Sequence, residues 1–301
     1  MSEEGDRIEL GQLAGEDGDE EDEDGDVDED EEEDHGHPSV AVKKIRKVNK
    51  RFYRTRAHSN PLNDGFYKVL PRAPREMDWA AQFPAWRERT RDVSDAIDRN
   101  ELAPYPQRQW FVDVGSGYGG LLAAMAPEYP DVWFVGLEIR ERVMEFCEAR
   151  LQRLRQDHPG KFDHLTYIRT NAMRFMPNFF VKQQIDKMFF CYCDPHFKKR
   201  KWRQRIISSK LLAEYAFVLK DGAVVYTVTD VKDLHEWMVG KFHSHPLFET
   251  LSDEQLAVDP IVPYVRDKTD EAIKVAKNGG SKYLACFRRL PNPPLSDQGE
   301  T

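Results

Sequence analysis

Short apolar runs alternate with amphipathic stretches along most of this chain of 301 residues. The runs are rich in β-branched and aromatic residues and stop at turn residues, which is typical of strands buried in a parallel sheet. The stretches between them predict helices, one of which begins at Leu121. This alternation predicts an α/β fold, a doubly wound sheet with helices on both faces. The expected strands are 111–114, 132–138, 165–169, 186–193 and 223–229, and the expected helices include 140–157 and 205–219.

The last apolar run, 282–289, follows Asn278-Gly279-Gly280 closely. A parallel strand needs a crossover connection of a dozen or more residues, for which there is little room here. We therefore expect this strand to pair antiparallel in an otherwise mostly parallel sheet.

A glycine-rich turn follows the first expected strand, with Gly115, Gly117, Gly119 and Gly120 in the sequence GSGYGG. Glycine permits positive φ and lets a ligand approach the backbone. The next strand ends at Glu138, at the position where open α/β sheets place an acid against the hydroxyls of a ribose. The pair predicts an adenosine-type cofactor.

The turn leaves the choice of cofactor open. Gly115, Gly117 and Gly120 satisfy the weak dinucleotide pattern G-x-G-x-x-G. Asp113 directly precedes the turn, and the glycines have a close G-x-G-x-G spacing. Both features are typical of methyltransferases that use S-adenosylmethionine, and they favour that cofactor over NAD.

A second motif lies where the expected strand 186–193 meets Asp194 and Pro195. Pro195 cannot continue a hydrogen-bonded ladder, so Asp194 should lie at the same sheet edge as the glycine turn. Aromatic and basic residues follow, which suits a nucleic-acid base bound next to its phosphates. The alternative is that Asp194 caps a following helix. The RNA contacts expected here are His196, Lys198, Lys199, Arg200 and Lys201.

The chain has an acidic N-terminal part and a basic remainder. Residues 1–34 hold 20 Asp or Glu and one Arg, whereas the remainder holds 33 acids and 43 bases. The acidic part has few apolar residues and is expected to be disordered. Eight Lys or Arg lie in 43–56, with aromatics between them, and this segment predicts phosphate contacts. The alternatives are that this segment is a nuclear localisation signal or a solvated linker. The predicted RNA contacts of this arm are Lys43, Lys44, Arg46, Lys47, Lys50 and Arg51.

These patterns predict an acidic tail over 1–42, a basic RNA-binding arm over 43–60, one folded domain over 61–290 and a short flexible C-terminus over 291–301. No apolar stretch approaches the length of a membrane span, and the first residues do not resemble a signal peptide. Disulfides are not expected among the four cysteines. Cys191, Cys193 and His196 have no second Cys/His pair nearby, so no metal site is expected.

The chain resembles the catalytic subunits of eukaryotic tRNA (guanine-N7)-methyltransferases over roughly residues 50–290. One position departs from the family pattern: Cys193 stands where a proline usually precedes the DPH triplet, which should loosen the approach to Asp194. The matching stretches are KRFYRTRAHSNP (50–61), EMDW (76–79), DVGSGYGGLL (113–122), GLEIR (136–140), RTNAMRFMPNFF (169–180), DPHFKKRK (194–201), RIISSKLLAEYAFVLKDG (205–222), YTVTDV (226–231), HPLFE (245–249) and NGGSKYLACFRR (278–289).

The resemblance implies the class I methyltransferase fold, a Rossmann-like seven-stranded sheet, with S-adenosylmethionine as cofactor. It implies transfer of a methyl group to N7 of a guanosine in the tRNA variable loop, with Asp194 holding the guanine. The implied cofactor contacts are Gly115 and Gly117 at the methionine and ribose, Glu138 at the ribose, Ile139, Arg140, Asn171 and Ala172 at the adenine, Cys191 beside the sulfonium, and Thr269 and Glu271 in a lid.

Simpler roles are open for three of these residues. Thr269 is a good helix N-cap, Glu271 suits the helix dipole as an acid in the first turn, and Asn171 is a common turn residue. The resemblance further implies a complex with a WD-repeat β-propeller subunit and a location in the nucleus, with the cytoplasm as an alternative. Two other functions stay open, a non-catalytic RNA-binding subunit and a methyltransferase for protein or another RNA.

Overall fold

The computed structural model describes residues 48–53, 55, 60–62, 70–86 and 108–293. The acidic tail and Lys43, Lys44, Arg46 and Lys47 of the arm lie outside these residues. The strands are β1 (Gln109–Val114), β2 (Val132–Glu138), β3 (Leu165–Arg169), β4 (Ile185–Cys191), β5 (Leu219–Thr229), β6 (Phe248–Thr250) and β7 (Tyr283–Arg289).

The helices lie mostly between these strands. They are α1 (Trp79–Gln82), α4 (Gly120–Met125), α5 (Glu141–Asp157), α6 (Ala172–Phe179), α7 (Ser209–Val218), α8 (Lys232–His243), α9 (Asp253–Val258), α10 (Val262–Asp267) and α11 (Asp270–Lys277), with the 3₁₀ helices η2 (Lys50–Tyr53), η3 (Pro74–Glu76) and η4 (Lys199–Gln204).

Seven strands form one sheet in the order β3-β2-β1-β4-β5-β7-β6. The strands from β3 to β5 pair parallel, and β7 pairs antiparallel with both β5 and β6. The order reverses direction between β1 and β4, which is where open α/β sheets bind their ligands. The predicted fold class is confirmed, including the antiparallel last strand.

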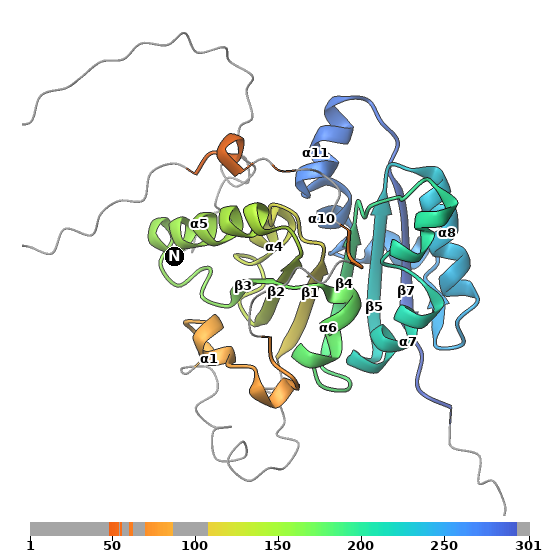
Figure 1. Cartoon of the computed structure of the whole chain (residues 1–301), viewed down its shortest axis with the longest axis horizontal. Helices are drawn as coiled ribbons and strands as arrows, with labels where there is room; N and C mark the ends of the chain where they lie inside the picture. The colour runs from red at the N-terminus through yellow and green to blue at the C-terminus, as the bar shows by residue number, and fades with distance from the viewer. Residues whose placement is uncertain (1–47, 54, 56–59, 63–69, 87–107, 294–301) are drawn as a thin grey trace, which may run out of the picture.

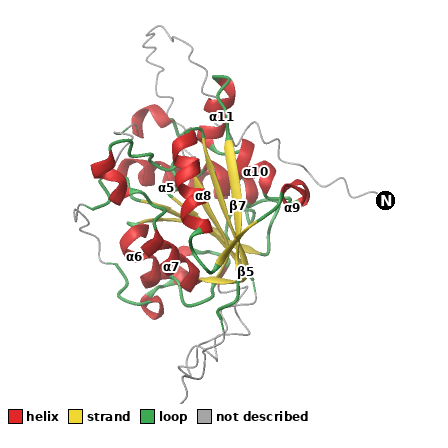
Figure 2. Cartoon of the chain, turned by 90° about the vertical axis from the view of Figure 1, so that its right-hand side faces the viewer, coloured by secondary structure: helices red, strands yellow, loops and turns green. Residues whose placement is uncertain are grey.

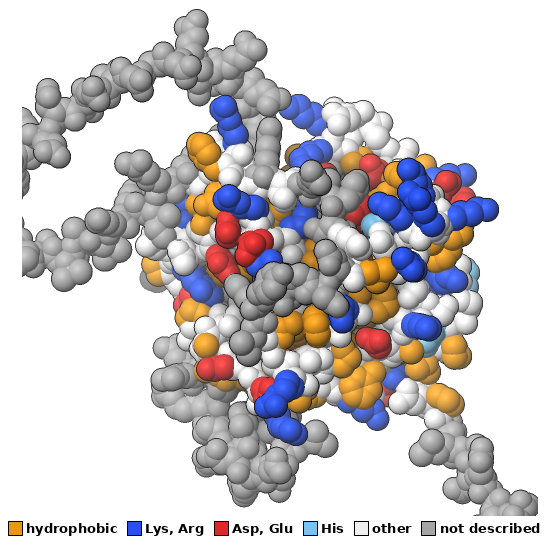
Figure 3. Space-filling view, in the orientation of Figure 1, with side chains coloured by type: hydrophobic (Ala, Val, Ile, Leu, Met, Phe, Trp, Pro, Cys, Tyr) orange, Lys and Arg blue, Asp and Glu red, His pale blue; other side chains and the backbone are white. Residues whose placement is uncertain are grey.

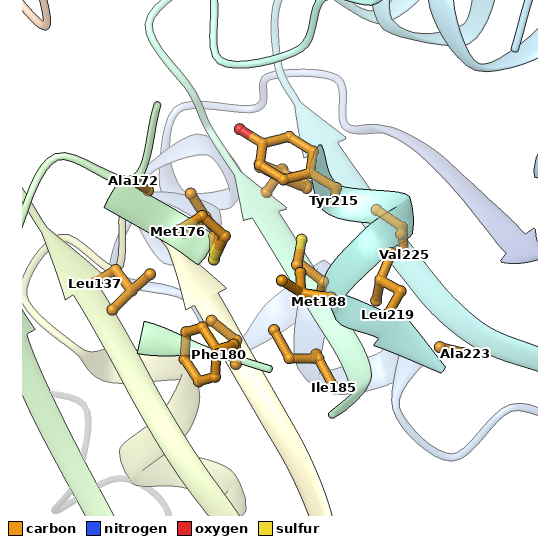
Figure 4. Close-up of a cluster of buried hydrophobic side chains, with 14 of the residues drawn as sticks. Leu137, Ala172, Met176, Phe180, Ile185, Met188, Tyr215, Leu219, Ala223 and Val225 are labelled. Atoms are coloured by element: carbon orange, nitrogen blue, oxygen red, sulfur yellow. The ribbon is translucent and has the colours of Figure 1, made fainter. Parts of the chain in front are cut away.

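Helices cover both faces of the sheet (Figures 1 and 2). Apolar side chains of α1, α6, α7 and α8 pack on one face, and those of α4, α5 and α10 pack on the other. Figure 4 shows part of the first core, where Met176 and Phe180 from the α6 region meet Ile185 and Met188 of β4. Both faces are buried, which is why the strands read as continuous apolar runs rather than alternating ones.

Several boundaries differ from the sequence-based expectation, and β1 and β5 begin earlier than expected, at Gln109 and Leu219. The helix expected over 205–219 begins only at Ser209, because the Ser208 side chain caps it by accepting from the Leu211 amide. The expected strand 186–193 ends at Cys191, since Tyr192 has a left-handed backbone with φ 51°. Among the described residues, no helix is long and apolar enough to cross a membrane, and no cluster of three or more His, Cys, Asp or Glu could hold a metal ion.

Candidate active site

A cavity of about 490 Å³ lies at the carboxyl ends of β1, β2 and β4. Its walls are the glycine turn after β1, the end of β2, the start of α6, the loop after β4 and the first turn of α11. All the residues predicted to bind a cofactor line it, together with two of those predicted at the guanine and RNA. The predicted residues that it brings together are Gly115, Gly117, Glu138, Ile139, Arg140, Asn171, Ala172, Cys191, Asp194, His196, Thr269 and Glu271.

Gly115 and Gly119 are required in the glycine turn for two different reasons. Gly115 has φ 79°, and a Cβ atom there would meet no atom within 4 Å, so the position opens onto the cavity. Gly119 has φ 76°, and a Cβ atom there would lie 2.5 Å from the ring of Tyr167. The Tyr167 hydroxyl donates to the Gly119 carbonyl at 2.7 Å. One glycine therefore leaves room for a ligand, and the other lets the turn pack on β3.

Glu138 organises the turn through its carboxylate. It is only 3% exposed, and Oε2 accepts from the Gly117 amide at 3.0 Å. Oε1 accepts from the Arg140 amide at 2.8 Å, and the Arg140 guanidinium donates to both oxygens at 3.1 Å. These contacts fix the end of β2 against the glycine turn. The ribose contact of Glu138 stays a prediction.

Asp113, at the end of β1, is a further acid in the cavity wall. The residue is 2% exposed, and its Oδ1 atom has no hydrogen-bond partner among the described residues. Burial, together with the negative charges of Glu138 and Asp270, raises the pKa of Asp113 to about 8. A buried polar atom without a partner is costly, which favours a site that a ligand completes. The Oγ atom of Ser116 is also buried without a partner in this part of the chain.

Asp194 lies on a strained loop after β4. Tyr192 and His196 flank it with φ 51° and 43°, values that side-chain-bearing residues rarely adopt and that cluster at functional sites. The Oδ2 atom of Asp194 lies 4.0 Å from His196 Nε2, and the Asp194 side chain is 25% exposed. The following helix η4 has Lys198 as N-cap, without a side-chain cap. The alternative that Asp194 caps that helix is therefore wrong.

The simpler roles of Asn171 and Thr269 are both observed. Asn171 Oδ1 accepts from the Met173 amide at 3.1 Å at the start of α6, and Nδ2 donates to the Pro61 carbonyl at 2.5 Å. Thr269 Oγ1 caps α11 by accepting from the Ala272 amide at 2.9 Å. Both residues also line the cavity, so their predicted cofactor contacts stay open.

Asp270 is a site residue that sequence reasoning missed. Its Oδ2 atom accepts from the Gly120 amide at 3.1 Å, and Oδ1 pairs with Lys50 Nζ at 2.8 Å. Burial alone would raise the pKa of Asp270, but the positive charges of Arg150 and Lys50 hold it below its usual value. Only its place between Thr269 and Glu271 could have indicated it. Lys50 is held in this ion pair with its side chain 15% exposed, and its predicted RNA contact stays a prediction.

Comparison with known proteins identifies the family. Residues 107–285 match the model of the family described as "Putative methyltransferase". The chain is 47% identical over 254 residues to a tRNA (guanine-N(7)-)-methyltransferase of Scheffersomyces stipitis, covering 83% of this chain and 80% of that one. The chain belongs to the tRNA (guanine-N7)-methyltransferase family.

Other members of the tRNA (guanine-N7)-methyltransferase family have a similar sequence identity to this chain. The enzyme of Zea mays is 44% identical, with 80% of this chain and 92% of that one covered. The enzyme of Brugia malayi is 47% identical, with 82% and 89% covered. Among solved structures, the chain is similar to the 16S rRNA methyltransferase KamB at 16% identity and a TM-score of 0.44, covering 66% of this chain and 95% of that one. That likeness is too low to support an argument.

The position that departs from the family pattern in this tRNA (guanine-N7)-methyltransferase is Cys193. Its side chain packs against the core on the face of α6 and α7. Burial raises the pKa of the Cys193 thiol to about 12, with added effects of the Asp113 and Asp194 carboxylates. The thiol is therefore neutral and acts as a small apolar group beside Asp194.

Basic residues flank the cavity on the side of η4. Phe197 is 69% exposed, and the residues 198–201 after it are exposed as well. In Figure 3, Lys and Arg side chains gather over the region of α8. Arg51 of the arm is also exposed. Residues 198–201 and Arg51 are exposed as the RNA contacts predicted for them require, and those contacts stay predictions.

Proposed function

We propose that this chain is the catalytic subunit that transfers a methyl group from S-adenosylmethionine to N7 of a variable-loop guanosine in tRNA. The observation that carries the proposal is the shared cavity. It joins the glycine turn and Glu138, which suit a nucleoside cofactor, to Asp194, which is followed by an exposed basic segment. The names of the relatives, all tRNA (guanine-N(7)-)-methyltransferases, support the reaction.

The cavity fits S-adenosylmethionine in three respects. The open position at Gly115 lets a ligand approach the backbone. Glu138 stands at the end of β2, where an acid binds a ribose. The unpartnered oxygen of Asp113 suits a cationic group of the ligand. When bound, this cofactor supplies an electrophilic methyl group on a positively charged sulfur.

Asp194 holds and orients the guanine in this proposal. N7 has its own lone pair in the plane of the ring, so the reaction needs no strong general base. Rate then comes from in-line positioning of the base. The purine gains positive charge as the methyl group transfers, and a fixed carboxylate stabilises that charge more in the transition state than in the ground state.

The tRNA would lie across the basic side of the cavity. Lys199, Arg200 and Lys201 are exposed on η4, directly after the loop that carries Asp194. Phosphate contacts from such residues provide affinity without reading the sequence. Exposed Phe197 offers an aromatic face for a neighbouring base.

Two further parts of the proposal rest on the family resemblance. A WD-repeat β-propeller subunit would join the catalytic chain and orient the tRNA. The basic arm over 43–60 would serve as an RNA contact, and it also suits a nuclear localisation signal, which supports the nucleus as the proposed location.

Methylation of tRNA by the full chain tests the proposal. The chain is incubated with tRNA and labelled S-adenosylmethionine, with and without the WD-repeat subunit, and the methylated nucleotide is mapped. N7-methylguanosine in the variable loop is the expected product. A chain that binds S-adenosylmethionine but methylates a protein or another RNA position would contradict the substrate, and a chain that does not bind it would contradict catalysis.

A further inference from the structure

Arg205 makes an unusual contact behind the loop that carries Asp194. The residue is 5% exposed. Its guanidinium carbon lies 4.9 Å from the ring centre of Trp202 and 4.6 Å from that of Trp237. The two rings are 5.0 Å apart, and they come from η4 and α8. A guanidinium against aromatic faces is held in place by cation–π attraction, which is stronger when the group is desolvated.

The ring of Trp237 is itself fixed. Its Nε1 atom donates to the Ile207 carbonyl at 3.0 Å, which sets the ring orientation on α8. The Arg205 amide donates to the Trp202 carbonyl at 3.0 Å, at the end of η4. Both rings that contact the guanidinium are therefore tied to the same short segment, 202–207. Trp202 belongs to this segment, and Trp237 donates a hydrogen bond to its backbone.

The guanidinium uses this fixed position to hold the Asp194 loop. Arg205 Nε donates to the Pro195 carbonyl at 2.9 Å. Pro195 lies between Asp194 and His196, and the backbone of His196 is left-handed with φ 43°. A backbone in that region persists only where surrounding contacts determine it. Arg205 is not among the residues that line the cavity, although Gln204 and Ile206 are.

We propose that Arg205, packed against the rings of Trp202 and Trp237, is a positioning residue that fixes the Asp194 carboxylate by holding the Pro195 carbonyl. The proposal rests on the proposed role of Asp194 in guanine methylation. It also connects the exposed basic residues of η4 to the same clamp, since Trp202 belongs to η4. Contact of RNA with η4 would then be transmitted to the loop through one rigid unit.

Two substitutions of Arg205 and one matched control test this role. Arg205→Gln removes the charge and the planar fork, and Arg205→Lys keeps the charge. Lys241→Gln is the control, because Lys241 Nζ lies 4.7 Å from the centre of the same Trp237 ring and does not contact the loop in the hydrogen bonds of the described residues. Three quantities are measured on the full chain: the single-turnover methylation rate at saturating tRNA and cofactor, the affinity for S-adenosylmethionine, and hydrogen exchange of residues 191–198.

Arg205→Gln should lower the methylation rate by about 100-fold, the loss that a misplaced reacting group produces. Cofactor affinity should stay unchanged, exchange of 191–198 should rise, and Arg205→Lys should recover part of the rate. Lys241→Gln should match the wild type in all three measurements.

An unchanged rate in Arg205→Gln would overturn the proposal, as would a rate that falls only in step with cofactor affinity or with the folded fraction. The exchange measurement separates this proposal from the proposed function. If the wild-type chain did not methylate tRNA but Arg205→Gln still loosened 191–198, the substrate would be wrong and the clamp on the loop would stand. If exchange were unchanged, the clamp itself would be wrong.

Discussion

The carboxylate of Asp270 lies where a side chain on Gly120 would be. A Cβ atom at Gly120 would meet Asp270 Oδ2 at 2.5 Å, and the same oxygen accepts from the Gly120 amide at 3.1 Å. The first turn of α11 is therefore joined to the glycine turn, 150 residues away in the chain. This contact closes one wall of the cavity, so it should affect ligand binding as well as stability.

Gly120→Ala should displace Asp270 and weaken binding of S-adenosylmethionine. Overpacking of a filled site costs about 1–3 kcal/mol, and part of that cost should appear as lost affinity. Calorimetric titration with the cofactor measures it. Gly240→Ala on α8 is the matched control, because a Cβ atom there meets nothing within 4 Å. That variant should leave affinity unchanged and stabilise the chain by about 0.4–1 kcal/mol. Equal affinity in both variants would contradict the role of the Asp270 contact.

Asp194→Ala should abolish methylation while cofactor affinity stays within about one order of magnitude, because the carboxylate serves the guanine rather than the cofactor. Asp194→Asn is the finer comparison, since it keeps the shape and removes the charge. Steady-state methylation of tRNA and calorimetry with the cofactor provide the two readouts. Full activity in Asp194→Ala would remove this residue from the reaction.

Glu138→Ala should weaken cofactor binding by about one to two decades, because a hydrogen bond to a charged group contributes roughly 1.5–3 kcal/mol. The structure adds an indirect effect, since Glu138 also holds the Gly117 amide and the Arg140 guanidinium. Glu138→Gln keeps one acceptor oxygen and should lie between wild type and Glu138→Ala. Unchanged affinity in Glu138→Ala would exclude the predicted ribose contact.

Binding of S-adenosylmethionine at pH 7 should release a proton from Asp113. The pKa of this carboxyl is about 8, so it is mostly protonated without a ligand, and a cation next to it favours the ionised form. Titrations in buffers of different ionisation enthalpy count the released protons, and about one is expected. Asp113→Asn should release none from this site.

The raised pKa of Asp113 also predicts how the stability of the chain without ligand depends on pH. A carboxyl whose folded pKa exceeds its unfolded value of 3.8 binds more protons when folded. Its contribution to the free energy of unfolding should therefore fall as pH rises from about 4 to about 8 and stay constant above that. A pH series of denaturant unfolding, compared with Asp113→Asn, measures this slope. An opposite slope would mean that the buried carboxyl is ionised at neutral pH.

Replacing Lys199, Arg200 and Lys201 by Gln should weaken tRNA binding and leave cofactor binding unchanged. Each lost phosphate contact should also reduce the log–log salt slope by up to ~0.9, by analogy with duplex DNA. Lys182→Gln is the control, because Lys182 is exposed just before β4, at the opposite end of that strand from Asp194. Equal loss of tRNA affinity in the control would indicate a non-specific effect of charge.

The sequence predicted the strands well because each is buried on both faces. The bounds expected for β2 and β3 match the structure, and β7 was expected to be antiparallel from its short connection. The three-residue strand β6 was not expected by position, since Phe248–Thr250 is too short for a pattern and exists by pairing with β7.

The candidate site was predictable where a motif ends a strand, and less so where distant segments meet. Gly115, Glu138 and Asp194 lie at or just after the carboxyl ends of β1, β2 and β4. Parallel strands end at the same edge of a sheet, so the sequence order was enough to place these residues together. The contact of Asp270 with Lys50 joins residues 220 positions apart, and no local pattern indicates it. Arg205 follows the basic segment 198–203 in the sequence, and only the tertiary fold shows that it is buried against two tryptophans.

The place of β7 in the sheet has a consequence for biosynthesis. β7 lies between β5 and β6, and β6 pairs with no other strand in the described sheet. While the ribosome has not yet released residues 283–289, β5 presents an open edge and β6 has no partner. An open edge is a template for pairing with other chains. The nascent methyltransferase therefore acquires its complete sheet only after residues 283–289 have left the ribosome, and a chaperone that shields β5 during that interval would raise the yield of folded enzyme.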